Sequence, residues 1–269
     1  MVNGKTRPFV LLGSPVEHSV SPAMHTAAFR ALGINAAYIP LRCDAGDVAQ
    51  IIRIICQAGG GGNITLPHKQ AAARAVTSPS QLVQASGACN TFWADDGAGG
   101  SRGENTDVAG VLSALDRLGA PATRWLVLGT GGSARAVVLA AGKKGAAVAV
   151  ESRTAERKRE FEAWAQGVGV SITVASECEV VINATPLGLT PGDALPSLPR
   201  SSSAVKVALD LVYGVDGTRW SKAMANAGIQ ASDGREALVA QGALSFRCWF
   251  PEHDPPVEVM RAVVNARLQ

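Results

Sequence analysis

The sequence feature that most limits the possible folds is a glycine-rich turn between a buried strand and a helix. The stretch "LVLGTGGSARA" contains Gly129-x-Gly131-x-x-Ala134, and the apolar run "RWLVLG" predicts a strand leading into it. The helical run "SARAVVLAAGKKG" follows, and "AAVAVES" predicts a second strand that ends about 20 residues after the turn. Backbone N–H groups at such a turn and helix start can face an anion, so the pattern predicts a dinucleotide-binding βαβ unit. A glycine turn that serves packing alone is the alternative.

The residues after this second strand bear on the choice of dinucleotide. Glu151 could bind a ribose diol, as in NAD-binding proteins, whereas Ser152, Arg153, Thr154 and Arg157 could hold a 2′-phosphate. Because successive strand residues face opposite sides, Glu151 and Ser152 are not both expected at the ribose. Two arginines just past the strand favour NADP. A solvated helix start is the alternative interpretation.

Short apolar runs alternate with helical patterns along the whole chain, which predicts an α/β fold. Further strands are expected at residues 8–13, 36–41, 61–66, 178–184 and 205–213, and further helices at residues 21–33, 47–59 and 108–119. A domain boundary is expected in or near the last of these helices, with "APATR" as a candidate linker.

Composition excludes several classes of protein. The 269 residues are 47% hydrophobic, enough for two medium domains or one large one. The net charge of +3 is spread along the chain, which suits a small anionic ligand and does not predict nucleic-acid binding. No signal peptide and no membrane span are expected from the apolar runs. Five widely spaced cysteines are typical of reduced thiols in a cytoplasmic protein.

Nine short motifs occur in an order that resembles one known family. They are "HSVSPAMH", "GNITLPHK", "GACNT", "GENTDVAG", "GTGGSARA", "SRT", "NATPLG", "DLVY" and "LVAQGALSF". In these motifs, and over nearly its whole length, the chain resembles the shikimate dehydrogenases. The resemblance implies reversible NADPH-dependent reduction of 3-dehydroshikimate to shikimate, a step of chorismate and aromatic amino-acid biosynthesis.

The resemblance also implies a domain organisation. An N-terminal α/β substrate-binding domain would comprise residues 1–112 together with C-terminal helices in residues 239–269. A Rossmann-type NADP-binding domain would comprise residues 113–238. The active site is then expected in the cleft, near the carboxyl ends of the strands.

Lys69 and Asp107 are the catalytic pair that the resemblance implies. Hydride transfer to a ketone leaves an alkoxide-like oxygen, which needs a proton and a nearby positive charge. A lysine has an ordinary pKa of about 10.4, which burial would lower and a neighbouring carboxylate would raise. The sequence leaves that balance open, and a surface lysine is the alternative.

The remaining site residues are implied by the same motifs. Those expected to bind substrate are Ser19, Ser21, Asn63, Thr65, Asn90, Tyr213 and Gln241. Those expected to bind the cofactor are Gly129, Gly131, Gly132, Ser133, Ala134, Ser152, Arg153, Thr154, Arg157, Asn183, Thr185, Leu211 and Gly234.

Three local expectations accompany these assignments. Ser21, before Pro22, is a candidate helix N-cap. The four glycines at 59–62 are expected to form a close turn before a strand. No metal site is expected, because His18, His25 and His68 lack ligand spacing.

Two departures from the family pattern and two rival functions remain open. Ala237 stands where the family usually has methionine near the nicotinamide, and Ser152 stands where asparagine is usual. One rival is a quinate/shikimate dehydrogenase that uses NAD or NADP. The other is a non-catalytic relative, which would be expected to lack Lys69 or Asp107, and both are present. Monomer and homodimer are both compatible with the sequence.

Overall fold

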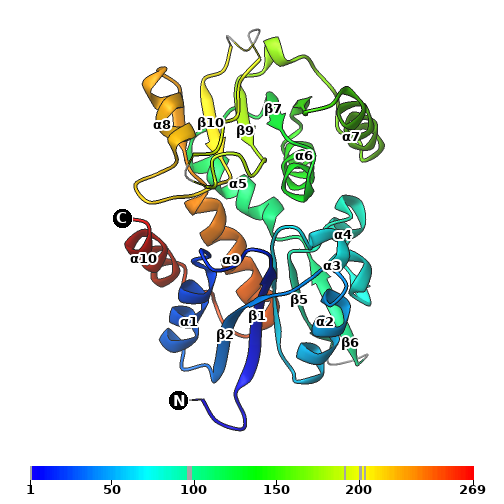
Figure 1. The fold of residues 1–269 in the computed structure, drawn as a ribbon, viewed down its shortest axis with the longest axis vertical. Coiled ribbons are helices and arrows are strands. Elements are labelled where there is room, and N and C mark those ends of the chain that lie inside the picture. The colour runs from blue at the N-terminus through cyan, green and yellow to red at the C-terminus, as the bar shows by residue number, and fades with distance from the viewer. Residues whose placement is uncertain (1, 96–98, 191, 200–201, 203) are drawn as a thin grey trace. The chain divides into compact units, whose positions relative to one another are not determined.

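The computed structural model describes residues 2–95, 99–190, 192–199, 202 and 204–269. It is an α/β protein, as expected, and it divides into two compact units (Figure 1). The first comprises Met1–Asp107 and Leu238–Arg267, and the second comprises Val108–Ala237 and Leu268–Gln269. The chain therefore leaves the first unit at the start of helix α5 (Asp107–Arg117) and returns to it within helix α9 (Arg235–Trp249).

The first unit contains a mixed six-stranded sheet in the order β2-β1-β3-β5-β6-β4. Its strands are β1 (Arg7–Gly13), β2 (Ala36–Arg42), β3 (Gly61–Ile64), β4 (Ser78–Pro79), β5 (Thr91–Asp95) and β6 (Gly100–Glu104). Its helices, besides most of α9, are α1 (Ser21–Ala31), α2 (Val48–Gln57), α3 (Lys69–Ala75), α4 (Gln81–Ser86) and α10 (Val257–Arg267). Strand β5 runs antiparallel to both of its neighbours, whereas the other pairs are parallel.

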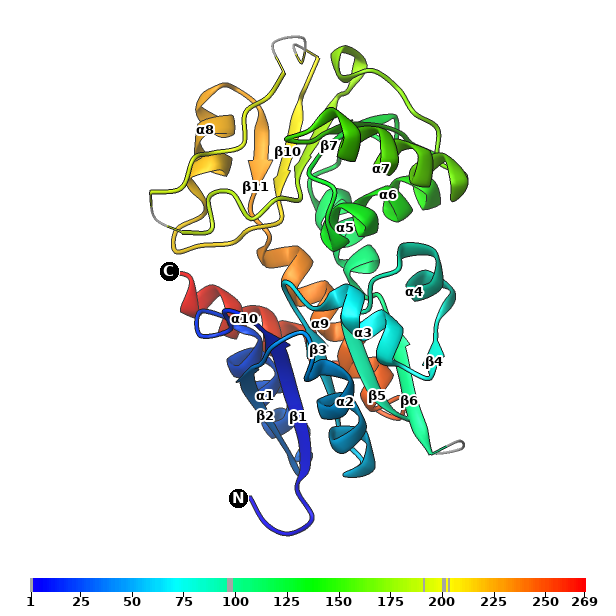
Figure 2. The same cartoon turned by 45° about the vertical axis from the view of Figure 1, so that its right-hand side comes forward.

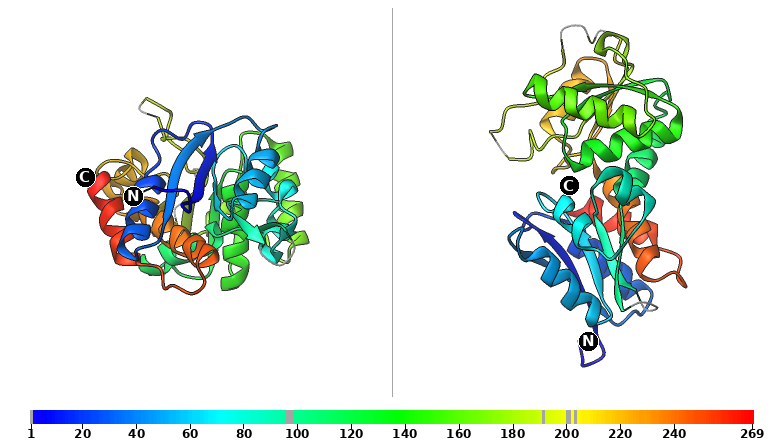
Figure 3. Two further views of the ribbon diagram at one scale, coloured as in Figure 1. Left: turned by 90° about the horizontal axis from the view of Figure 1, so that it is seen from below. Right: turned by 90° about the vertical axis from the view of Figure 1, so that its right-hand side faces the viewer.

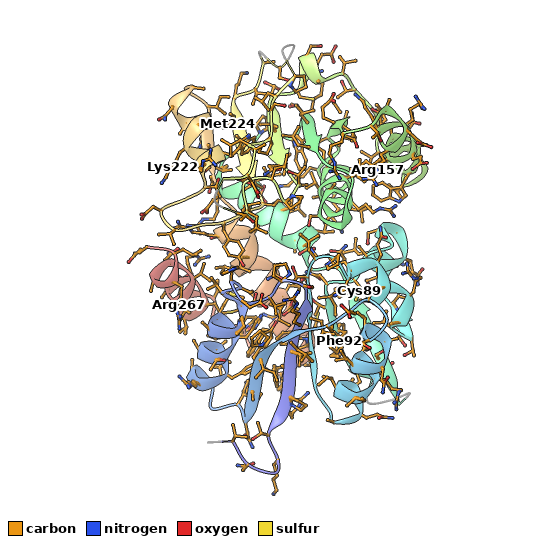
Figure 4. The ribbon with its side chains drawn as sticks, viewed as in Figure 1. Cys89, Phe92, Arg157, Lys222, Met224 and Arg267 are labelled. Carbon is orange, nitrogen blue, oxygen red and sulfur yellow. The ribbon has the colours of Figure 1, made fainter. Side chains whose placement is uncertain are left out.

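Helices cover both faces of this sheet. Side chains alternate along β1, so its apolar residues face both sides of the sheet and pack against helices on each. Val10 and Leu12 lie in an apolar cluster with α2, and Phe92 and Cys89 belong to the same cluster (Figure 4). Phe9 faces the other way and contacts aromatic side chains of α1 and α9. Figures 2 and 3 show α2 and α3 on one face, with α1, α9 and α10 on the other.

The four-glycine run does more than form a turn. Gly59 has a φ of +69° and makes the turn after α2, as expected. Gly60, Gly61 and Gly62 instead lie at or within β3, where a Cβ atom would overlap backbone oxygens of Pro8, Phe92 and Val10. These three glycines allow β3 to approach β1 and β5 closely, and they fix the strand from which the site residues follow.

The second unit contains a wholly parallel five-stranded sheet in the order β11-β10-β9-β7-β8. Its strands are β7 (Arg124–Leu128), β8 (Ala147–Glu151), β9 (Val180–Asn183), β10 (Val207–Asp210) and β11 (Gln230–Ser232). Besides most of α5, its helices are α6 (Gly132–Lys144), α7 (Ala155–Gly167), α8 (Arg219–Asn226) and the 3-10 helix η1 (Ala175–Glu177). After β7 the chain turns to β8 on one side and later to β9 on the other. The point between β7 and β9 is therefore the topological switch point, where open α/β sheets bind ligands.

Apolar residues from the strands and from α8 form one core of this unit. Leu126, Val181 and Ala208 pack with Trp220, and Met224 of α8 adds to this cluster. Figure 4 labels Met224 and the exposed Lys222 on the same helix. Helix α6 packs on β7 and β8, and α7 packs on β8. In the part of the chain that the structure describes, no helix is both long enough and apolar enough to span a membrane.

Candidate active site

A lysine and an aspartate form a close ion pair in the first unit. Lys69 is the first residue of α3, shortly after β3, and Asp107 is the first residue of α5. The Nζ atom of Lys69 donates to Oδ2 of Asp107 at 2.6 Å. Their side chains are largely buried, with exposed fractions of 13% and 19%. The carboxylate directs the amine, and the remaining exposed surface of both groups lets them contact a small polar ligand.

Asn90 holds the second oxygen of Asp107. Its Nδ2 atom donates to Oδ1 of Asp107 at 2.8 Å and lies 3.3 Å from Oε1 of Gln241, on α9. Its Oδ1 atom accepts the backbone N–H of Thr106 at 2.8 Å, which fixes the direction of the amide. Lys69, Asn90, Asp107 and Gln241 are distant in sequence, and the structure brings them together. We call these four residues the polar cluster.

Asn63 belongs to a buried layer behind this cluster. Its side chain is 5% exposed, and its Oδ1 atom accepts a hydrogen bond from the Tyr38 hydroxyl at 2.8 Å. Its Nδ2 atom lies 3.0 Å from Oγ1 of Thr91, 2.9 Å from Oγ of Ser245 and 3.2 Å from the carbonyl oxygen of Asn90. All polar atoms of this side chain therefore have partners within the protein.

Sequence reasoning missed the partners of Asn63. Ser245 lies one helical turn after Gln241 on α9, and its hydroxyl also donates to the Gln241 carbonyl at 2.9 Å. Tyr38 stacks on the buried ring of His25, with ring centroids 4.7 Å apart. Desolvation lowers the pKa of His25 to about 3, so its imidazole is neutral here. The helical spacing of Gln241 and Ser245 was the signal that could have revealed part of this layer.

The paired serines lie at the start of α1. The Oγ atom of Ser19 accepts the backbone N–H of Ser21 at 3.2 Å, and Ser21 is 5% exposed. The expectation that Ser21 caps this helix is wrong, because Ser21 is its first residue and Val20 is the N-cap, with no side-chain cap bond. Thr65 follows β3, and its backbone N–H donates to the Leu12 carbonyl at 2.8 Å. The half-buried side chains of Ser19 and Thr65 are accessible to a ligand in the first unit.

The glycine turn of the second unit lies at the switch point between β7 and β9. Gly129 has a φ of +109°, and a Cβ atom there would lie 3.0 Å from Cγ2 of Thr185. Gly131 is the N-cap of α6, and a Cβ atom there would meet nothing within 4 Å. The first turn of α6 has no acidic residue, and its N-cap makes no side-chain hydrogen bond. These features fit a pyrophosphate, with Gly132, Ser133 and Ala134 in the first helical turn.

The residues after β8 fit a second anionic group. Arg153 and Arg157 are exposed, and Figure 4 labels Arg157 on α7. Thr154 is the N-cap of α7, and its side chain accepts the backbone N–H of Arg157 at 3.4 Å. Ser152, which follows the last residue of β8 and precedes Arg153 in the sequence, is half-buried. Two guanidinium groups and a hydroxyl within six residues provide the donors that a 2′-phosphate needs.

A hydrogen bond between side chains at the ends of β9 and β10 joins the turns that follow these strands. Asn183 is fully buried; its Nδ2 atom donates to Oδ1 of Asp210 at 2.8 Å, and its Oδ1 atom accepts the Thr185 hydroxyl at 2.7 Å. Burial raises the pKa of the Asp210 carboxyl, although hydrogen bonds from Thr218, the Val212 amide and Asn183 act in the opposite direction. The amide of Asn183 therefore supports the turn that carries Thr185.

The turn that contains Tyr213 is held by Arg235, which is itself held by Asp233; the sequence analysis singled out neither residue. Arg235 donates to Oδ2 of Asp233 at 3.0 Å and to the carbonyl oxygen of Gly214 at 2.8 Å. A Cβ atom at Gly234 would overlap the Leu211 carbonyl, so only glycine fits there. Tyr213 belongs to this second unit, whereas the other residues expected to bind substrate belong to the first.

Among the described residues, no group of three or more His, Cys, Asp or Glu side chains could hold a metal ion. His25 is enclosed by aromatic rings, and Nε2 of His68 lies 2.9 Å from the Cys43 carbonyl oxygen. The five cysteines are all free thiols. Burial raises the pKa of Cys89, whose backbone N–H bonds the Lys69 carbonyl, to about 12.

The parallel sheet of the second unit, with a glycine turn at its switch point, and the lysine–aspartate pair of the first unit are typical of a dinucleotide-dependent oxidoreductase. The family model described as the shikimate dehydrogenase substrate binding domain matches residues 11–92. The model described as the shikimate 5′-dehydrogenase C-terminal domain matches residues 234–264.

Full-length comparisons agree with these matches. The shikimate dehydrogenase (NADP(+)) of Methanothrix thermoacetophila is 38% identical, over 97% of both chains. The shikimate 5-dehydrogenase of Thermus thermophilus, solved with NADP(H) and shikimate, has a TM-score of 0.85 and 34% identity, over 97% of this chain and 99% of that one. A shikimate dehydrogenase solved with NADP+ has a TM-score of 0.88 and 28% identity, over 100% and 98%. The chain belongs to the shikimate dehydrogenase family.

Proposed function

We propose that the protein catalyses the reversible NADPH-dependent reduction of 3-dehydroshikimate to shikimate. The observation that carries this proposal is the 2.6 Å pair of Lys69 and Asp107, with Asn90 on the other carboxylate oxygen. Relatives over nearly the whole chain bear the name shikimate dehydrogenase (NADP(+)), and one was solved with both ligands. Lys69 and Asp107, which the proposed proton transfer requires, are both present here.

Lys69 is proposed to move the proton of the reaction. NADPH, when bound, supplies the hydride that reduces the ketone. In that direction the Lys69 ammonium gives a proton to the former ketone oxygen, and in the reverse direction the amine accepts the proton of the hydroxyl. Asp107 holds the amine in position through its Oδ2 atom and balances the charge of the ammonium.

The other expected residues are assigned to binding. Ser19, Ser21 and Tyr213 are proposed to bind the substrate carboxylate, while Asn90 and Gln241 bind ring hydroxyls, with Thr65 beside them. Asn63 was also expected to bind substrate, but its buried amide bonds within the protein, and we propose instead that it supports Asn90 through the Asn90 carbonyl oxygen. Each ring hydroxyl needs a donor or an acceptor, because an unpaired polar group in a dry site is costly.

The cofactor residues are assigned to three parts of NADP. The turn from Gly129 to Ala134 would hold the pyrophosphate, and Ser152, Arg153, Thr154 and Arg157 the adenosine 2′-phosphate. The turns with Thr185, Leu211 and Gly234, supported by Asn183, would line the nicotinamide side. The compact units divide at Asp107 and Ala237, and we assign substrate to the first and NADP to the second. The functional boundaries at residues 112 and 238 stay a prediction.

We also propose that the protein works in the cytoplasm as a monomer or a homodimer. Five free thiols suit a reducing compartment. Size-exclusion chromatography with light scattering will distinguish the two assembly states.

An absorbance assay at the nicotinamide band tests the proposed activity. Shikimate and quinate are each offered with NADP and with NAD, which gives four pairs of substrates. Shikimate with NADP is expected to give the highest kcat/KM. An equal or higher value for quinate with NAD would replace this proposal with the quinate variant.

A further inference from the structure

Glu151 stands at a position that bears on the choice of cofactor. It is the last residue of β8, and its carbonyl oxygen accepts the backbone N–H of Gly129 at 2.8 Å. In sheets of this kind, an acidic residue about 20 positions after the glycine turn binds the ribose diol of NAD. An unpaired carboxylate here would favour NAD and would repel the 2′-phosphate of NADP.

Lys158 covers the charge of Glu151. Its Nζ atom lies 3.0 Å from Oε1 of Glu151, and the two side chains are 36% and 34% exposed. The backbone N–H of Lys158 donates to the Thr154 carbonyl at 3.2 Å, in the first turn of α7. The same helical turn therefore carries Arg157 and positions the lysine that neutralises the nearby carboxylate.

The two arginines differ from Lys158 in this respect. Arg153 and Arg157 are exposed, and within the described residues neither guanidinium forms an ion pair or a hydrogen bond. Their charges are available for a ligand, whereas the charge of Lys158 is engaged by Glu151. A half-exposed pair of this kind contributes little to folding stability, so a role in binding accounts better for it.

We infer that Lys158 is a specificity-determining residue, which allows the 2′-phosphate to bind by neutralising Glu151. This inference rests on the proposed use of NADP. Lys158 acts through Glu151, and Arg153 and Arg157 provide the contacts to the phosphate. The effect of Lys158 should therefore disappear when Glu151 carries no charge.

Binding of two probes that differ only in the 2′-phosphate tests the inference without any turnover. The dissociation constants of ADP-ribose and 2′-phospho-ADP-ribose are measured by isothermal titration calorimetry, and their ratio gives the preference for the phosphate. Lys158→Met should lower this ratio about 10-fold, equivalent to about 1.4 kcal/mol, because the Glu151 carboxylate would then be left uncovered and would repel the phosphate. The double variant Glu151→Gln/Lys158→Met should regain the ratio of the unaltered protein to within about 3-fold.

Lys206→Met is the matched control. Lys206 lies 2.8 Å from Glu179, and both residues precede the strands β10 and β9, at the end of the sheet away from the glycine turn. This variant loses the same charge and should keep the full preference. Thermal unfolding of all variants checks that each is folded.

The outcomes separate this inference from the proposed function. If the unaltered protein binds both probes equally, the proposed use of NADP fails. If it prefers the phosphate and Lys158→Met keeps that preference, only the inference fails. If the double variant stays as weak as Lys158→Met, Lys158 contacts the phosphate directly, and neutralisation of Glu151 is overturned.

Discussion

The polar cluster of the first unit and the cations after β8 in the second unit are built in opposite ways. Lys69 and Asn90 each donate to one oxygen of Asp107, and the buried amide of Asn63 donates to the Asn90 carbonyl. Arg153 and Arg157 are exposed and make no ion pair within the described residues. We propose from this comparison that the Lys69–Asp107 pair is positioned before a ligand arrives, whereas the two arginines become ordered when an anion binds. Substitutions should therefore affect rate and folding in the first region, and only ligand affinity in the second.

The largest effect is expected from Lys69→Ala. If Lys69 transfers the proton, its loss should lower kcat by roughly 10²–10⁴-fold, the usual contribution of a positioned acid–base group. The KM for shikimate should change far less, because binding rests on other residues. Lys69→Arg should not restore the rate, since a guanidinium cannot give up its proton at neutral pH. Steady-state kinetics with shikimate and NADP measure both; a near-normal kcat with a raised KM would make Lys69 a binding group.

Asn63→Leu should produce the next largest effect and should distinguish the two regions most clearly. The change leaves the Tyr38 hydroxyl and the Ser245 hydroxyl without one partner each, in a buried layer. The free energy of unfolding should fall by about 2–4 kcal/mol, since the buried hydrogen bonds that the Asn63 side chain makes are lost at roughly 0.5–1.5 kcal/mol each. Denaturant unfolding measures the loss, and Tyr38→Phe, which removes one hydrogen bond, should cost less. An unchanged free energy of unfolding in Asn63→Leu would show that this buried layer does not stabilise the first unit.

Arg153→Ala should affect the cofactor alone. Loss of a charge-assisted contact should raise the KM for NADP by an amount equivalent to about 1.5–3 kcal/mol, with little effect on NAD. The free energy of unfolding should stay within about 0.5 kcal/mol of the unaltered value, because the side chain is exposed. Kinetics with both cofactors provide the measurement. An equal loss with NADP and NAD would remove Arg153 from the 2′-phosphate site.

The smallest effect is expected from Ser19→Ala. One hydrogen bond to the substrate carboxylate should be worth about 1 kcal/mol, or roughly a 5-fold weaker binding of shikimate. NADP binding should not change. Since Ser19 also accepts the Ser21 N–H, thermal unfolding is recorded alongside calorimetry of shikimate binding. A folded variant with unaltered shikimate affinity would exclude Ser19 from the site.

The elements that could be predicted are those whose signals are local. Apolar runs predicted β1, β2, β7 and β8, because a buried strand is recognised from a short run of neighbouring residues. The glycine turn after β7 was predicted for the same reason, since its backbone conformation depends on its own glycines. The ion pair of Lys69 and Asp107 was expected from two short motifs. The antiparallel strand β5 and the role of Gly61 and Gly62 were not expected, since they depend on which strands become neighbours.

The contacts that could not be predicted from the sequence join residues that are far apart along the chain. Asn63 and Ser245 are separated by 182 positions, and the one local signal, the helical spacing of Ser245 from Gln241, does not indicate that Ser245 meets Asn63. Arg235 contacts the Gly214 carbonyl 21 positions away, across a turn whose path only the folded chain fixes. Both contacts support residues that the sequence singled out, but the contacts themselves were not predicted.

Chemical rescue of Lys69→Ala tests the central claim, that the amine of Lys69 transfers the proton, most directly. Small primary amines such as methylamine and ethylamine are added to the variant, and kcat is measured with shikimate and NADP. The account predicts that kcat rises with amine concentration, that the slope depends on the amine's pKa, and that the KM for shikimate stays constant. Lys69→Arg, whose side chain still fills the site, should gain nothing. A series of amines that leaves kcat of Lys69→Ala unchanged, or that alters only KM, would contradict proton transfer by Lys69.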